Sequence, residues 1–143
     1  MGYPSMNNIS HYNQVNRESG VADASPHRLV QMLLEGALKK IAIVKGLIHR
    51  HDIARKGEMI GQAISIVEGL RSSLNQQDGG EIAVKLNHLY EYIEQRLIQA
   101  NIKNDTAILD EVAGLLKEIK SGWDIIPQEL RQRNRAELAT ASV

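Results

Sequence analysis

The sequence predicts an all-α protein, an antiparallel up-and-down four-helix bundle with a mobile N-terminal segment and a C-terminal tail. Apolar residues recur at alternating steps of three and four along four successive segments, which is the period of a helix with one buried face. Short connections join these segments, and such connections favour antiparallel neighbours. No part of the sequence indicates a strand.

The first helix is expected over residues 26–50, where the start signal is clear. Ser25 can accept a hydrogen bond from the free backbone N–H groups, and Pro26 suits the first helical position because it has no N–H to leave unpaired. Gly36 lies inside this helix and destabilises it by about 1 kcal/mol relative to alanine. A glycine kept at this cost indicates a surface where another chain approaches the backbone closely. The apolar seam of the helix comprises Val30, Leu34, Ala37, Ile41, Val44 and Ile48.

The other three helices are expected over residues 53–73, 80–100 and 105–126. Gly79 and Gly80 allow a turn with positive φ before the third helix, and Pro127 discourages continuation of the fourth. The seams, in helix order, are Ile60, Ala63, Val67, Leu70 and Leu74; Leu86, Tyr90, Ile93, Leu97 and Ala100; and Leu109, Val112, Leu116, Ile119, Trp123 and Ile126.

The two ends of the chain differ from this core of residues 25–127. Residues 1–24 are polar and form the mobile N-terminal segment, but Ile9, Tyr12 and Val15 sit three apart and can make one apolar face of a short helix. Residues 128–143 lack a long apolar stripe, so they are predicted to be a frayed helix or a disordered tail.

Composition sets the class of protein independently. The 143 residues suffice for one domain with a hydrophobic core. The 17 basic and 17 acidic side chains balance, so the net charge gives no reason to expect a nucleic-acid partner. The absence of cysteine excludes disulfides and thiol catalysis, and is consistent with a reducing cytoplasm. We see neither a signal peptide nor an apolar run of about eighteen residues, so we expect no membrane insertion.

The run from Ala24 to Ala37, Ala-Ser-Pro-His followed by Met-Leu-x-(acid)-Gly-Ala, resembles the opening of the flagellin-specific export chaperones, the FliS family. Where the family usually has an aromatic residue and aspartate before this Gly-Ala, the chain has Leu34 and Glu35, so the charge is kept and the ring is lost. Further matches in the family's order are Ile9, Tyr12, Gln14 and Val15 upstream, and Gly79 to Ala83, Leu86, Leu89 to Tyr92, Arg96, Leu97, Ala100, Asn101 and Trp123 downstream.

The resemblance implies a cytoplasmic, non-enzymatic chaperone. Its client is newly made flagellin, bound through the disordered C-terminal segment that otherwise drives premature filament assembly, and the loaded complex passes to the flagellar type III export gate. In the family the N-terminal segment is associated with the client groove. Ile9, Tyr12 and Val15 are therefore expected to cover apolar surface while the chaperone is empty.

Apolar residues that fall off the predicted seams are candidates for the groove itself. Met59 and Ile66 lie a heptad apart on the second helix, as do Ile108 and Leu115 on the fourth. Apolar rows outside the core suit the helix-in-groove mode of binding an amphipathic client. A wide core face or the seam of a homodimer, formed when the protein is empty, explains the same residues and stays open. The predicted partner-binding residues are Ile9, Tyr12, Val15, Met59, Ile66, Ile108 and Leu115.

Other classes of function have weaker support in the sequence. A histidine phosphotransfer bundle needs an exposed mid-helix histidine, and His88 is the one candidate, but bulky and acidic residues follow it. A structural oligomerisation module would also use the extra apolar stripes. No histidine has glutamate three residues before it, and no zinc or phosphate-loop motif occurs, so we expect no catalytic residues, metal or cofactor. The basic cluster from Lys39 to Lys56 contains no aromatic residue, which disfavours a nucleic-acid interface.

Overall fold

The computed structural model describes residues 25–74 and 76–141, with side chains described for residues 25–74 and 79–125. This part of the chain forms helices and no strand, which confirms the predicted all-α bundle. The helices are α2 (Pro26–His49), α3 (Ile53–Ser72), α4 (Gln76–Lys103) and α5 (Thr106–Ala141).

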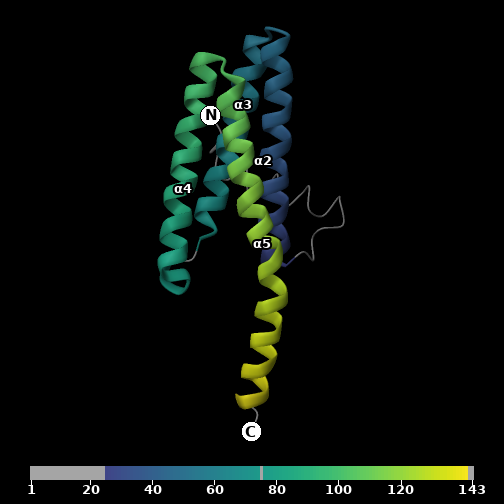
Figure 1. Ribbon diagram of the computed structural model, residues 1–143, viewed down its shortest axis with the longest axis vertical. Coiled ribbons are helices and arrows are strands. Elements are labelled where there is room, and N and C mark those ends of the chain that lie inside the picture. Colours follow the sequence, from purple (N-terminus) through teal and green to yellow (C-terminus); the bar gives the residue numbers. More distant parts are fainter. Residues whose placement is uncertain (1–24, 75, 142–143) are drawn as a thin grey trace, which may run out of the picture.

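The four helices run alternately up and down (Figure 1), and their pairwise contacts close a ring. Helix α2 packs against α3 and α5, and α4 packs against the same two neighbours. Each helix thus has two neighbours and must bury a stripe wide enough to face both.

The predicted start of α2 is confirmed. Ser25 has an extended backbone, and its Oγ accepts a hydrogen bond from the Arg28 backbone N–H at 3.1 Å. Asp52 does the same for α3, where its Oδ1 accepts from Arg55 N–H at 3.3 Å. Side-chain caps of this kind satisfy donors that the first helical turn leaves free.

Helix α4 begins before the predicted position, at Gln76, but it is interrupted at Gly80, where φ is 55° and ψ is −133°. Glycine adopts this backbone without the steric cost that a side chain imposes. Gly79 is also constrained, because an added Cβ would lie 2.7 Å from Cβ of Ala83. The glycine pair therefore makes the sharp bend that the sequence predicts, within the first turns of the helix.

Helix α5 does not end near Pro127 as predicted but continues to Ala141. Its last part extends past the ends of the other helices (Figure 1). Proline inside a helix removes the N–H that would bond the carbonyl four residues earlier, here that of Trp123. A substitute donor on α2, described below, satisfies this carbonyl.

All four helices contribute to one buried core. Leu47 belongs to the buried residues although it lies off the predicted seam, whereas Ile48 on that seam is only partly buried. The central cluster comprises Leu34, Ala37, Ile41, Val44, Ile60, Ala63, Ile66, Val67, Leu70, Tyr90, Ile93, Leu97, Ala100, Ile108, Leu109, Val112 and Leu116.

Candidate partner-binding surface

The predicted partner-binding residues fall into three groups. Ile9, Tyr12 and Val15 lie outside the described residues. Met59 and Leu115 are partly buried and pack against the edge of the core cluster, so part of each side chain faces outward.

Ile66 and Ile108 form the third group, and the prediction that they lie outside the core is wrong. Ile66 is 8% exposed, Ile108 is 4% exposed, and both belong to the central cluster. The reason is the ring arrangement: a helix with two neighbours buries more than one three-four seam. Ile66 and Ile108 each precede a seam residue and widen that seam.

Gly36 lies close to Ile66 in the contact between α2 and α3. A methyl group added at Gly36 would meet Cδ1 of Ile66 at 3.6 Å, an ordinary van der Waals distance. Packing within the isolated chain therefore does not require glycine at this position.

An exposed apolar row on α4 is a surface that the sequence analysis did not single out. Val84 is 45% exposed, Ile98 is 49% exposed and Ile102 is 74% exposed. At about 100° per residue, Ile102 lies in the same direction as Val84 and one turn beyond Ile98. We call Val84, Ile98 and Ile102 the α4 apolar row. Their positions off the predicted seam were visible in the sequence, but the same is true of many surface residues.

Polar contacts flank the α4 apolar row toward α5. Glu111 accepts hydrogen bonds from the Tyr92 hydroxyl at 2.8 Å and from Arg96 Nε at 2.7 Å. The hydrogen bond to Glu111 raises the pKa of Tyr92, and the bonds from Arg96 and Tyr92 lower the pKa of Glu111. The carboxylate thereby holds the two α4 side chains against α5.

The opposite flank, between α3 and α4, is an open polar depression of about 420 Å³ lined by Glu68, Arg71, Ser72 and Asn87. The Arg71 guanidinium donates to Asn87 at 3.0 Å, Glu94 at 3.0 Å and Glu91 at 2.8 Å. Burial raises the pKa of Glu94, whose Oε1 is buried without a hydrogen-bond partner. This depression suits polar groups and does not suit the apolar face of a helix.

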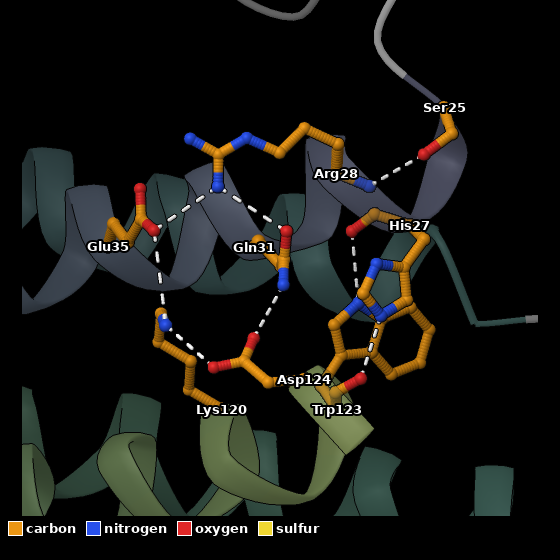
Figure 2. A network of polar contacts seen from close by, with 8 residues as sticks. All are labelled: Ser25, His27, Arg28, Gln31, Glu35, Lys120, Trp123 and Asp124. Atoms are coloured by element: carbon orange, nitrogen blue, oxygen red, sulfur yellow. Dashed lines mark hydrogen bonds and ion pairs between the residues drawn. The ribbon is translucent and has the colours of Figure 1, made fainter. Parts of the chain in front are cut away.

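A close contact between the first turn of α2 and α5 joins His27 and Trp123 (Figure 2). Their rings stack, with centroids 5.0 Å apart and planes 5° from parallel. His27 Nε2 lies 2.7 Å from the Trp123 carbonyl oxygen, and Trp123 Nε1 donates to the His27 carbonyl at 3.0 Å. Each residue therefore bonds the backbone of the other, and we call this pair the His27–Trp123 clasp.

Charged side chains continue the contact between α2 and α5 beside the clasp (Figure 2). Asp124 accepts hydrogen bonds from Gln31 at 2.6 Å and from Lys120 at 2.8 Å, and these bonds lower its pKa. Glu35 lies 3.3 Å from Arg28 and 3.9 Å from Lys120. Exposed ion pairs of this kind contribute about 0–1 kcal/mol each, so they orient the helices more than they stabilise them.

The described residues hold no candidate metal site. No group of three histidine, aspartate or glutamate residues there could hold a metal ion. His88 is exposed on α4, as expected for a surface histidine. Within the same part of the chain, no helix has the length and apolar character needed to cross a membrane.

Comparison with known sequences assigns the chain to a family. Residues 6–130 match the profile described as "Flagellar protein FliS". A "Flagellar secretion chaperone FliSB" of Pseudomonas aeruginosa is 50% identical over 119 residues, which cover 83% of this chain and 94% of that protein. The "Flagellar secretion chaperone FliS" of Vibrio cholerae is 42% identical over 89% of this chain and 93% of its own length. That of Salmonella typhimurium is 42% identical over 89% and 96%.

The chain belongs to the FliS family. This confirms the resemblance found in the sequence. The FliS relatives are named as secretion chaperones, a non-enzymatic role, so the prediction that the chain is not an enzyme is also confirmed.

The FliS family assignment directs attention to positions 34 and 35, where the sequence departs from the usual aromatic residue and aspartate. Leu34 is fully buried in the core. Glu35 is exposed and pairs with Arg28 and Lys120. In this FliS chain, position 34 therefore faces the core, and position 35 takes part in the contact between α2 and α5.

Two tyrosines in the stretch that resembles FliS have different surroundings. Tyr90 is 2% exposed and belongs to the core, where burial raises its pKa to about 12. Tyr92 is 41% exposed and bonds Glu111. Tyr90 therefore serves packing within the FliS bundle, whereas Tyr92 is available at its surface beside the α4 apolar row.

Proposed function

We propose that this chain is a cytoplasmic flagellar secretion chaperone that binds the disordered C-terminal segment of flagellin. It keeps bound flagellin from polymerising prematurely and delivers it to a component of the flagellar type III export gate. The observation that carries the proposal is the family match over residues 6–130, which spans the helical bundle through Trp123. The names of the relatives support the chaperone role at the level of flagellar secretion.

The α4 apolar row is the part of the described surface that best suits such a client. Val84, Ile98 and Ile102 lie along one direction of the helix. Ile98 and Ile102 are four residues apart, a spacing at which an amphipathic client helix also presents apolar residues in the helix-in-groove mode. Burying one isoleucine contributes about 1.5–3 kcal/mol, but a disordered client also loses conformational entropy on binding. Several shallow contacts therefore support binding that another partner can reverse.

Met59 and Leu115 are proposed as further client contacts because part of each side chain is exposed. Ile66 and Ile108 are assigned to the core and would act on binding only through packing beneath these residues. The proposed client contacts thus come from α3, α4 and α5.

We also propose that Ile9, Tyr12 and Val15 cover apolar surface in the empty chaperone and leave it when flagellin binds. The support for this proposal is the apolar spacing within an otherwise polar segment. Covering exposed apolar residues limits self-association. A homodimer of the empty protein would provide the same protection, and light scattering with and without client separates the two arrangements.

The test uses the purified chain, flagellin, and flagellin lacking its C-terminal segment, with co-elution in size-exclusion chromatography as the measurement. We expect co-elution with intact flagellin and none with the truncated form. Ile98→Gln and Ile102→Gln should weaken the complex at least about tenfold, which corresponds to about 1.4 kcal/mol. The matched control is Ile82→Gln, because Ile82 is 72% exposed on the same helix and points about 160° away from Ile102. Equal binding of both flagellins would contradict the proposed client segment.

A further inference from the structure

The continuation of α5 through Pro127 depends on how the Trp123 carbonyl is bonded. In a regular helix this carbonyl accepts from the N–H four residues later, but proline has no N–H. His27 Nε2 lies 2.7 Å from the carbonyl oxygen. A carbonyl oxygen can only accept, so Nε2 carries the hydrogen. A side chain of α2 thus supplies the donor that α5 lacks in its own sequence.

The geometry of the clasp makes this substitution specific. Trp123 Nε1 donates back to the His27 carbonyl at 3.0 Å, and the stacked rings hold the imidazole in place. His27 is the second residue of α2, directly after Ser25 and Pro26 (Figure 2). The donor therefore stands at the point where the chain enters the bundle.

Among the residues whose side chains the structure describes, few other contacts hold α5 just before Pro127. Up to residue 125, Leu116 is the last fully buried residue of α5, Ile119 and Trp123 are partly buried, and Ile125 is 62% exposed. The remaining described contacts are the exposed bonds of Lys120 and Asp124 to α2. Leaving the Trp123 carbonyl without a hydrogen bond at a partly buried site destabilises the helix by more than one exposed ion pair stabilises it.

We propose that the His27–Trp123 clasp is a conformational switch that sets whether α5 remains helical beyond Pro127. With the clasp closed, His27 bonds the Trp123 carbonyl and the helix continues to Ala141. With the clasp open, this carbonyl loses its donor and residues 128–141 lose helical order. The first turn of α2 thereby controls a segment at the other end of the chain.

The trigger of the switch rests on the proposed function. Residues 1–24, which include the proposed cover residues Ile9, Tyr12 and Val15, end three positions before His27. Movement of this segment when flagellin binds acts directly on the first turn of α2. The loaded and empty chaperones would then differ in the helical length that α5 offers to the export apparatus.

The switch is tested without client by amide hydrogen exchange in the full chain. His27→Ala should speed exchange of residues 128–141 about tenfold, as expected from loss of one partly buried hydrogen bond, while amides of α3 and α4 exchange as before. The control is Gln31→Ala, which removes the bond to Asp124 and leaves the clasp intact. Pro127→Ala restores an N–H for the Trp123 carbonyl, so His27→Ala in that background should leave exchange of residues 128–141 nearly unchanged.

Either of two results overturns the switch. One is exchange in residues 128–141 that is fast in the unmodified protein or unaltered by His27→Ala. The other is an effect of His27→Ala that persists in full with Pro127→Ala. The trigger is followed by the fluorescence of Trp123, the chain's one tryptophan, during addition of flagellin. Constant Trp123 fluorescence while flagellin co-elutes contradicts the trigger. Failure of flagellin to co-elute contradicts the proposed function. In both cases the hydrogen-exchange experiment still decides whether the clasp is a switch.

Discussion

Lys56 of α3 donates a hydrogen bond to the Asn104 side chain at 2.5 Å, although Lys56 is only 4% exposed. Its Nζ also donates to the Asn101 carbonyl in the last turn of α4, at 2.8 Å. A cation near the carbonyl end of a helix is favourable. Asn104 has a φ of 52°, a conformation that asparagine tolerates better than most residues. One lysine thus fixes the connection between α4 and α5.

Replacing Lys56 by methionine should lower the free energy of unfolding by about 1–3 kcal/mol, because two acceptors lose their donor at a buried site. Urea unfolding measures the change. The matched control is Lys45→Met, because Lys45 pairs with Asp110 at 2.5 Å but is exposed, and we expect a loss of at most about 1 kcal/mol. Equal losses in the two variants would show that burial of Lys56 has no energetic role.

Ile108→Ala should destabilise the protein by about 2–5 kcal/mol, since it leaves a cavity in the core. Met59→Ala should cost less, because Met59 is only partly buried against the cluster. Thermal or urea unfolding separates the two, with flagellin binding measured on the folded fraction. A loss of less than about 1 kcal/mol in the free energy of unfolding for Ile108→Ala would contradict the core position of Ile108.

Gly36→Ala should stabilise the free protein by about 0.5–1 kcal/mol, because alanine favours the helix and an added methyl has room beside Ile66. If flagellin needs close access to the backbone here, the same change weakens client binding. Ser25→Ala provides the comparison, since loss of its cap should cost about 1 kcal/mol and leave the affinity for flagellin nearly unchanged. Destabilisation by Gly36→Ala would contradict the packing seen at this site.

Glu94 gives a prediction for the effect of pH. Burial raises the pKa of this carboxyl above its ordinary value of 4.5, with Arg71 opposing the shift. The folded state therefore binds the proton more tightly than the unfolded chain does. The contribution is favourable at low pH and is lost as pH rises through the raised pKa.

The measurement is the free energy of unfolding of the unmodified protein and of Glu94→Gln across this pH range. We expect the difference between the two to shift in favour of the glutamine variant as pH increases. The comparison cancels the contribution of carboxyl groups that do not interact with Glu94. A difference that is constant with pH would mean that Glu94 has the same pKa in both states.

Deleting residues 1–17 should increase the binding of an apolar dye, promote self-association or do both, because the proposed cover of Ile9, Tyr12 and Val15 is removed. The affinity for flagellin should also change. Tyr12→Ala should reproduce part of the effect, since an aromatic ring buries more area than either aliphatic side chain. If the deletion alters neither dye binding, oligomeric state nor affinity for flagellin, the proposed covering role of this segment is wrong.

The sequence predicts well those features that depend on residues close together along the chain. The Ser25 cap and the positive φ of Gly80 follow from the residues at those positions. The seams through Leu34, Val67 and Leu109 are buried as their spacing predicts. Each of these features depends on neighbours within a turn or two of the chain.

The features that the sequence does not predict depend on contacts between distant residues. Ile66 and Ile108 are buried because each helix faces two neighbours, which the spacing along one helix cannot reveal. The length of α5 depends on a donor from His27, on another helix. The α4 apolar row becomes apparent only when the packing leaves Ile98 and Ile102 uncovered.

The ring of helices also bears on how the chain folds as it is synthesised. Contacts of α3 with α2 and α4, and of α4 with α5, join helices that are consecutive in sequence. The contact between α2 and α5 instead joins residues as far apart as His27 and Trp123, 96 positions along the chain. Closing so long a loop loses the most chain entropy. The earlier helices can associate while α5 is still within the ribosome, and the seam between α2 and α5 closes last.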